Sequence, residues 1–99
     1  MTVDFHVHSS CSDGTFSPRE LIEQSGFLSA LALTDHDNCD GVREFFEVES
    51  PTDVFRVSGL ELSIEPGENF DKFHLLGLGV DAENIQLKKF LESIVKERN

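Results

Sequence analysis

The sequence predicts an α/β fold, and three observations support this prediction. Short apolar segments rich in β-branched residues alternate with segments of helical pattern, in the order strand, loop, helix, strand, loop, helix. The 99 residues are enough for one small domain and too few for a second. The chain contains no internal repeat, linker or low-complexity segment. We therefore expect about four strands and three helices, with parallel strands joined by right-handed crossovers.

The first predicted strand is followed by a capped helix. Residues 1–7, MTVDFHV, are mainly apolar, β-branched and aromatic, which predicts a strand. This strand ends before the polar run SSCSDGT. Ser17, Pro18 and Glu20 have the spacing of a capping box. This pattern opens a helix that reaches about Gly26.

A second strand and a second helix follow. Residues 30–34, ALALT, have the composition of a buried strand, which ends at the polar run DHDNCDG. Because proline cannot continue a helix, Pro51 must end the helix that comes next. The apolar residues that predict this short helix are Val42, Phe45, Phe46 and Val48.

Two further strands and an amphipathic helix complete the predicted elements. Residues 54–65 and 73–80 have strand composition, and the turn-forming run EPGENFD separates them. In the final segment, apolar residues recur at helical spacing with lysine and glutamate opposite them. The apolar face consists of Leu87, Phe90, Leu91, Ile94 and Val95.

Charge and cysteine content exclude several classes of partner. Eight Lys and Arg residues against 19 Asp and Glu residues give a net charge of −11, which opposes binding to duplex nucleic acid by counterion release. No apolar run approaches the roughly 20 residues of a membrane span, and the N-terminus has no export pattern. We therefore expect a cytoplasmic protein without membrane contacts. Cys11 and Cys39 are too few for a disulfide framework or a four-thiolate zinc site, so we expect reduced thiols.

All four histidines fall where a predicted strand begins or ends. His6 and His8 leave the first strand, His36 leaves the second, and His74 opens the fourth. Glu61 lies inside the third strand. Functional groups collect at strand ends in α/β folds, and the side-chain period of two lets the first two rings point to one centre.

Taken singly, these residues have ordinary structural explanations. The paired histidines fit an exposed strand end, and His74 fits a core position with satisfied hydrogen bonds. The aspartates and His36 of the run TDHD fit a turn or a helix cap. An unpaired carboxylate is costly to bury in an apolar strand, so a buried salt bridge is the best structural explanation of Glu61.

Taken together, the same residues predict a cluster of two or three divalent metal ions. Imidazole and carboxylate bind zinc, manganese and iron, and four imidazoles, Asp13 and Glu61 are expected near one edge of the sheet. A carboxylate such as Glu61 can bridge two cations, and a pair about 3.5–4 Å apart can bind a phosphoryl group and activate a water. No glycine-rich phosphate loop and no Gly-x-Ser-x-Gly motif competes as a catalytic centre.

Four segments follow one another over residues 4–81, namely DFHVHSSCSDG, ALTDHDNCDG, SGLELS and KFHLLGLGVD. In this order they resemble the N-terminal motifs of the PHP (polymerase and histidinol phosphatase) metal-dependent phosphoesterases. The likeness is strongest to the branch that hydrolyses nucleoside 3′,5′-bisphosphates and short oligonucleotides. It implies a distorted (β/α)7 barrel with two or three Mn, Zn or Fe ions at the carboxyl ends of its strands.

The resemblance also implies six metal ligands, which are His6, His8, Asp13, His36, Glu61 and His74. The first two would share one ion, and the glutamate would bridge this ion and a second, which His74 completes. The aspartate and His36 would bind a third. Among these ligands, the resemblance implies a catalytic role for Glu61 and His36.

Other polar residues of the motifs are expected to support the ligands. Asp4, Asp35 and Asp37 occupy motif positions that do not bind metal, and we expect them to orient imidazoles by hydrogen bonds. Ser9 and Ser12 either line the phosphate site or cap the loop.

By the same resemblance, the reaction is hydrolysis of a phosphate ester of a nucleotide or short oligonucleotide by a metal-activated water. The bound cations would let an acidic protein hold an anionic substrate.

The family has further ligands, a later histidine and a C-terminal Asp-x-His, that this chain does not contain. We therefore expect the N-terminal part of a PHP domain, with the metal motifs in residues 1–81, an amphipathic helix in 82–99 and an unclosed barrel. Such a half-barrel exposes a strand edge and an apolar helix face, which predicts a homo-oligomer or a domain swap. Water, a second copy, Cys11 or Cys39 could replace the missing ligands.

Three other functions remain open from the sequence. The chain could be a metal-binding fragment without catalysis, or the PHP domain of a DNA polymerase. A hydrolase of C–N bonds, from the amidohydrolase barrels that also begin with His-x-His, would generally need a carboxylated lysine at a strand end. The nearest lysine, Lys72, falls in a predicted turn.

Overall fold

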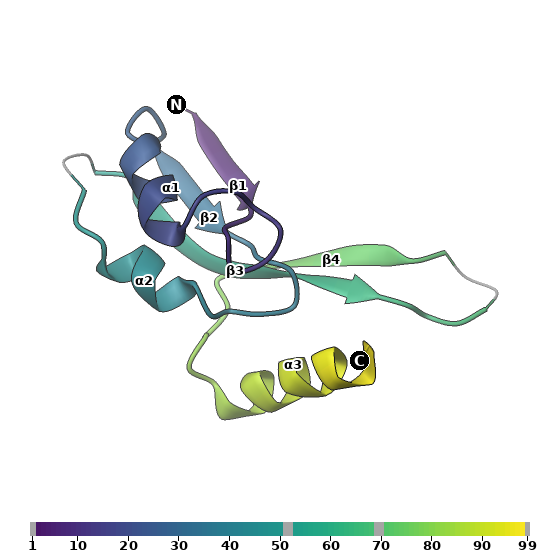
Figure 1. Cartoon of the computed structure of the whole chain (residues 1–99). Helices are drawn as coiled ribbons and strands as arrows, with labels where there is room; N and C mark the ends of the chain where they lie inside the picture. The colour runs from purple at the N-terminus through teal and green to yellow at the C-terminus, as the bar shows by residue number, and fades with distance from the viewer. Residues whose placement is uncertain (1, 51–52, 69–70, 99) are drawn as a thin grey trace.

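A computed structural model describes residues 2–50, 53–68 and 71–98 of the protein. Within these ranges, four strands form one mixed sheet in the order β1–β2–β3–β4, and three helices accompany it (Figure 1). The predicted α/β fold and the predicted number of strands and helices are confirmed. The sheet is open, with β1 and β4 at its two edges.

The first three strands run parallel, as predicted. Strand β1 (Val3–Val7) pairs with β2 (Ala30–Leu33), and β2 pairs with β3 (Phe55–Ile64). The pairing of β1 shifts in register between Asp4 and Val7. All four residues of β2 are buried, which agrees with its apolar composition.

The prediction of parallel pairing is wrong for the fourth strand. Strand β4 (Phe73–Leu78) runs antiparallel to β3, and in this register Ser63 is opposite His74. The short connection at 65–72 is the reason, because a parallel return needs a crossover of a dozen or more residues. The two strands form a hairpin that extends beyond the rest of the sheet (Figure 1).

The capping box predicted for the first helix is present. Helix α1 (Pro18–Gln24) begins after Ser17, whose hydroxyl accepts a hydrogen bond from the Glu20 N–H at 3.2 Å. The Glu20 carboxylate accepts from the Ser17 N–H at 3.1 Å. The helix ends at Gln24, slightly before the predicted end.

Helix α2 (Val42–Glu47) also forms where the sequence predicts it. The chain becomes extended at Val48, so the helix ends before Pro51, which lies outside the described residues. The Glu44 carboxylate of α2 accepts a hydrogen bond from the Arg19 N–H in the first turn of α1, at 2.9 Å. This contact joins the two helices.

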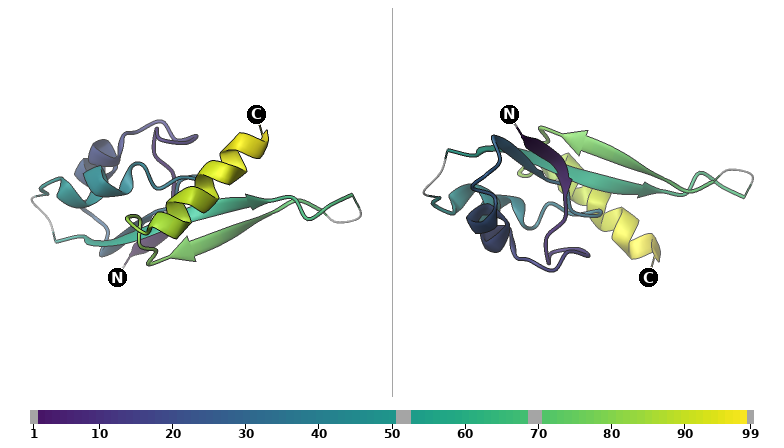
Figure 2. Two further views of the ribbon diagram at one scale, coloured as in Figure 1. Left: turned by 90° about the horizontal axis from the view of Figure 1, so that it is seen from below. Right: turned by 90° about the horizontal axis from the view of Figure 1, so that it is seen from above.

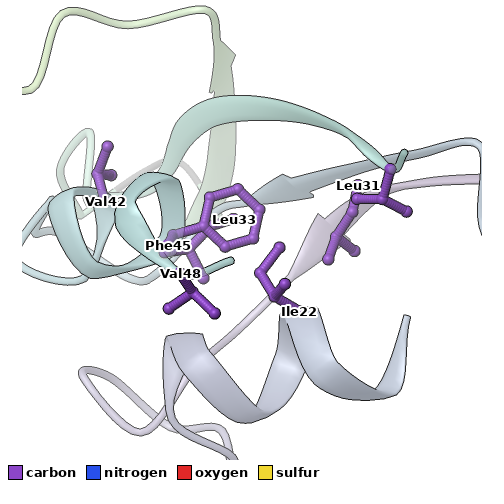
Figure 3. Close-up of a cluster of buried hydrophobic side chains, with 7 residues drawn as sticks. Ile22, Leu31, Leu33, Val42, Phe45 and Val48 are labelled. Atoms are coloured by element: carbon purple, nitrogen blue, oxygen red, sulfur yellow. The ribbon is translucent and has the colours of Figure 1, made fainter. Parts of the chain in front are cut away.

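The main core lies between β2 and the first two helices. Side chains from β2 pack against one side chain of α1 and two of α2 (Figure 3). The Phe45 side chain is fully buried in this cluster. The cluster consists of Ile22, Leu31, Leu33, Val42, Phe45, Val48 and Val54.

Helix α3 (Ile85–Arg98) lies below the β3–β4 hairpin in the view of Figure 1, and the view from below in Figure 2 shows it in front of the strands. Its predicted apolar face is covered only in part, since Leu91 is buried and Phe90 is 50% exposed. Leu87 and Ile94 are half-buried, and the side chain of Val95 lies outside the described residues. In the described part of the chain, none of the helices combines the length and apolar character needed to cross a membrane.

Candidate metal centre

The Glu61 carboxylate is the centre of a cluster of imidazoles. Its side chain is only 4% exposed, although it is charged. Oε1 lies 2.7 Å from His6 Nε2 and 2.8 Å from His8 Nε2. Oε2 lies 2.5 Å from His74 Nδ1. One buried carboxylate therefore contacts imidazoles from both edge strands of the sheet.

The backbone places His36 beside the same carboxylate. Beyond the end of β2, His36 forms an isolated parallel bridge with Glu61. The Glu61 N–H donates to the Asp35 carbonyl at 2.9 Å, and the Asp37 N–H donates to the Glu61 carbonyl at 3.0 Å. His36 Nε2 lies 3.9 Å from Glu61 Oε1. This main-chain pairing extends the parallel sheet to the point where the predicted ligands meet.

Asp13 reaches the cluster from the loop that follows β1. Asp13 Oδ1 lies 2.5 Å from His8 Nδ1, and Asp13 Oδ2 lies 3.2 Å from His36 Nε2. The loop is tight at Gly14, where an added Cβ would lie 2.2 Å from the His8 carbonyl oxygen. Glycine is therefore required for this close approach of the backbone to itself.

The hairpin brings His74 to the site. His74 is the second residue of β4, and its partner in register, Ser63, is near the end of β3. The start of an antiparallel strand lies beside the end of its neighbour, so His74 reaches the same edge as the other histidines. The predicted meeting of these residues is confirmed, although β4 runs opposite to the predicted direction.

The six predicted ligands form three groups that could each hold a metal ion. In each group, the candidate ligand atoms lie within 4.8 Å of one another. Neighbouring imidazoles are close, with ring centroids 4.3 Å apart for His8 and His36 and 5.2 Å apart for His36 and His74. The groups are His6, His8 and Glu61; His8, Asp13 and His36; and His36, Glu61 and His74. Their imidazole and carboxylate atoms fit divalent transition metals.

The electrostatics of the cluster follow from these contacts. Burial raises the pKa of Glu61, but hydrogen bonds from His6 and His8 outweigh this effect and hold the pKa below its usual value. Burial lowers the pKa of His8, and the hydrogen bonds and charges of Asp13 and Glu61 together raise it above its usual value. The hydrogen bond to His8 lowers the pKa of Asp13. The carboxylates are therefore ionised and available as ligands at neutral pH.

The three aspartates that were expected to orient imidazoles contact backbone groups and loop hydroxyls in the described part of the chain. The Asp35 carboxylate accepts hydrogen bonds from the backbone and hydroxyl groups of Ser9 and from the Ser12 hydroxyl. Asp37 accepts from the Ser63 N–H at 2.9 Å, and Asp4 accepts from the His6 N–H at 3.2 Å. These bonds hold the backbone segments that carry His6, His8 and Glu61. Of the two explanations for Ser9 and Ser12, the structure favours loop capping.

Sequence reasoning missed two residues that join these segments. The Thr34 N–H donates to the Val7 carbonyl at 2.7 Å, which ties the end of β2 to the end of β1. Asn38 Nδ2 donates to the Cys11 carbonyl at 3.0 Å and to the His36 carbonyl at 3.2 Å. Both residues flank the run DHD, so their position in the sequence beside predicted site residues could have indicated that they support the site.

The two cysteines lie outside the three ligand groups found in the described part of the chain. Cys11 is an exposed free thiol, and Cys39 is a half-buried one. Burial, with the charges of Asp40 and Asp35, raises the pKa of Cys39. This thiol is therefore protonated at neutral pH, which is not the form that binds metal.

Comparison with known proteins matches residues 4–97 to the PHP domain model. A 3′,5′-nucleoside bisphosphate phosphatase of Chromobacterium violaceum is 34% identical over 98 residues, which are 97% of this chain and 34% of the phosphatase. An error-prone DNA polymerase of Mycolicibacterium paratuberculosis is 43% identical over 67 residues, which are 64% of this chain and 6% of the polymerase.

Comparison of structures gives a similar result. The solved structure of an amidohydrolase from Chromobacterium violaceum, with bound sulfate and no metal, matches with a TM-score of 0.88 and 33% sequence identity. The match covers 99% of this chain and 34% of that protein. The fold is therefore that of the N-terminal part of a larger barrel, and the chain spans about a third of the length of the phosphatase and of the amidohydrolase.

Proposed function

The chain belongs to the PHP domain family, and on this premise we propose that it is the N-terminal part of a metal-dependent phosphoesterase. Its substrate would be a phosphate ester of a nucleotide or short oligonucleotide. The observation that carries the proposal is the buried Glu61 carboxylate, which has an imidazole within 2.8 Å on each oxygen. The nucleoside bisphosphate phosphatase among the relatives supports the substrate class.

The proposed ligand assignment uses the three groups of the cluster. His6 and His8 bind a first ion, Glu61 bridges the first and second ions, and His74 binds the second. Asp13 and His36 bind a third ion. The contacts of both Glu61 oxygens support a bridging role, because each oxygen faces a different set of imidazoles.

Divalent Mn, Zn or Fe ions in such a site would lower the pKa of a bound water and neutralise charge on a phosphoryl group. The chain's own residues would fix the positions of the ions, and burial of Glu61 limits the access of water to its carboxylate. Glu61 and His36 are the proposed catalytic residues. Both belong to the group that also contains His74, and Glu61 is in addition the carboxylate proposed to be shared by two ions. For the domain organisation we propose that residues 1–99 are the N-terminal part of a PHP domain, with the metal motifs in 1–81 and an amphipathic helix in 82–99.

The net charge of the chain bears on the kind of substrate, and its free cysteines bear on the cellular location. The net charge of −11 favours a small anionic substrate held through cations and opposes duplex nucleic acid. The bound sulfate of the related amidohydrolase structure is tetrahedral, like phosphate. We place the protein in the cytoplasm, because both cysteines are free.

Two alternatives predict different behaviour. The identity to the error-prone polymerase is higher but covers a shorter stretch, so the PHP domain of a polymerase is the second candidate. In that case, the coding sequence after residue 99 would continue into a polymerase. Hydrolysis of C–N bonds is disfavoured, since the Lys72 side chain is 79% exposed and paired with Glu65 at 3.3 Å.

The proposal is tested by hydrolysis of p-nitrophenyl phosphate and of a nucleoside 3′,5′-bisphosphate with added Mn²⁺. We expect turnover that a chelator abolishes, and we expect Glu61→Gln to lower the rate by more than the roughly 10–100-fold typical of residues outside the ligand shell. Glu65→Gln is the matched control, because it makes the same change on a carboxylate that is 67% exposed. Binding of Mn²⁺ without metal-dependent turnover would instead identify a metal-binding fragment.

A further inference from the structure

A buried carboxylate outside the proposed ligand set lies against the ligand loop, which we define as residues 8–14. Asp35 is 1% exposed. Its Oδ1 accepts from the Ser9 N–H at 2.6 Å and from the Ser12 hydroxyl at 2.7 Å. Its Oδ2 accepts from the Ser9 hydroxyl at 2.6 Å. The carboxylate therefore binds three donors of one short loop.

These bonds determine where the rest of the ligand loop turns. The Ser9 carbonyl accepts from the Ser12 N–H at 3.1 Å and from the Gly14 N–H at 2.9 Å. Ser9 is itself fully buried. Because the carboxylate fixes Ser9, the loop folds back onto Ser9. Asp13 Oδ1 then lies 2.5 Å from His8 Nδ1, and Asp13 Oδ2 lies 3.2 Å from His36 Nε2.

The main chain of Asp35 connects the ligand loop to the bridging carboxylate. Its carbonyl accepts from the Glu61 N–H at 2.9 Å, and the next residue is His36. One residue thus holds the ligand loop through its side chain and β3 through its backbone. The relative position of Asp13 and the other ligands depends on both connections.

We infer that Asp35 is a positioning residue, which holds the ligand loop so that Asp13 completes the ion site shared with His36. This inference rests on the proposed metal centre and deepens it. The expected role differs from orienting an imidazole, because the three side-chain bonds that Asp35 makes to the described residues all go to serine groups of the loop. A ligand held this way loses less conformational freedom when it binds an ion.

The test measures Mn²⁺ binding by equilibrium dialysis and metal analysis, with thermal unfolding of each variant as a check of folding. We expect Asp35→Asn to lower Mn²⁺ affinity by about 10–100-fold, because an amide nitrogen in place of Oδ2 cannot accept from the Ser9 hydroxyl and the remaining oxygen is an uncharged, weaker acceptor. Ser12→Ala, which removes one donor, is the milder second variant and should lower affinity in the same direction. Ser12→Thr keeps the hydroxyl and should retain the affinity of the original chain.

A double variant separates positioning from general stabilisation. If Asp35 acts through Asp13, Asp35→Asn will cause no further loss of affinity in an Asp13→Ala background. The conservative core variant Ile22→Val, at a buried position, should lower the unfolding temperature without changing Mn²⁺ affinity.

Other outcomes would overturn the inference in distinguishable ways. An additive loss in the double variant, or unchanged affinity in both Asp35→Asn and Ser12→Ala, would reject the positioning role while leaving the metal centre intact. Failure of the original chain to bind Mn²⁺ would reject the proposed metal centre and this inference with it.

Discussion

Glu61 shows how a single residue can indicate a site before its partners are known. A buried carboxylate in an apolar strand is costly unless it is paired, so the residue itself predicted nearby donors or cations. The structure supplies four imidazoles from three separate segments, and the nearest contact is 2.5 Å. Their identity could be proposed from strand ends, but their distances depend on the register of the sheet.

At the residue scale we predict that the metal-free chain is most stable at mildly acidic pH. The pKa of Glu61 is lowered on folding, so its contribution is present above the usual glutamate pKa of about 4.3 and is lost as pH falls through the lowered value. The pKa of His8 is raised, so its contribution is present below the usual histidine pKa of about 6.5 and is lost as pH rises through the raised value.

Thermal unfolding with a chelator present, followed over a range of pH, measures this effect. Glu61→Gln should flatten the maximum, because the amide has no charge to pair with the imidazoles. Added Mn²⁺ should move the maximum to higher pH, since the ligands must lose protons to bind metal. A metal-free unfolding temperature that keeps rising above pH 7 would contradict the prediction.

The elements of the fold differ in how far the sequence determined them. The α1 capping box is a local pattern, and it forms with both of its hydrogen bonds. The direction of β4 is not local, because it depends on whether the segment after β3 makes a hairpin or a crossover. The turn residues of EPGENFD are compatible with a hairpin, but the alternation of strands and helices favoured parallel pairing, and that prediction is wrong for β4.

At the scale of the element we predict that Gly14→Ala disrupts the ligand loop. The new Cβ would lie 2.2 Å from the His8 carbonyl oxygen and 2.9 Å from the Ser9 carbonyl oxygen, so the backbone must move. We expect a loss of about 1–3 kcal/mol in the free energy of unfolding, together with weaker Mn²⁺ binding. Urea unfolding and equilibrium dialysis measure the two effects.

Gly77→Ala is the matched control for this variant. The nearest atom to its added Cβ would be Val80 Cγ1 at 3.3 Å, followed by Leu60 Cδ2 at 3.6 Å, so the contacts are made mainly with side chains that can adjust. We therefore expect a much smaller loss of stability and unchanged Mn²⁺ affinity. Equal losses in the two variants would show that the close approach in the ligand loop is not the cause.

At the scale of the whole molecule, several apolar side chains of the β3–β4 hairpin are exposed to solvent. Leu76 is paired in register with Glu61, and Leu78 with Gly59, so both lie on the same face of the sheet as the Glu61 carboxylate. They are 38% and 46% exposed. The open edge of β4 lies beside this face. In a solution of the purified chain, a second copy is the available partner for these surfaces.

At this scale we predict that the purified chain self-associates through the hairpin. Sedimentation velocity over a range of concentrations should show a species larger than the monomer, because burial of apolar surface and pairing of strand edges both favour association. Leu78→Gln should shift this equilibrium toward the monomer. Phe27→Gln is the control, because this residue is 77% exposed in the loop after α1, outside the hairpin. It should leave the association equilibrium unchanged. A chain that remains monomeric at all concentrations would contradict the prediction.

The sequence by itself determined the elements, the family and the set of six candidate ligands. Strand composition, the capping box and the ordered motifs are local patterns, so they persist in whatever arrangement the chain adopts. Tertiary structure alone decided the antiparallel direction of β4, the contacts of both Glu61 oxygens and the role of Asp35 in holding the ligand loop. These features join residues far apart in the chain, and their geometry follows from strand register and loop closure, which no short segment specifies.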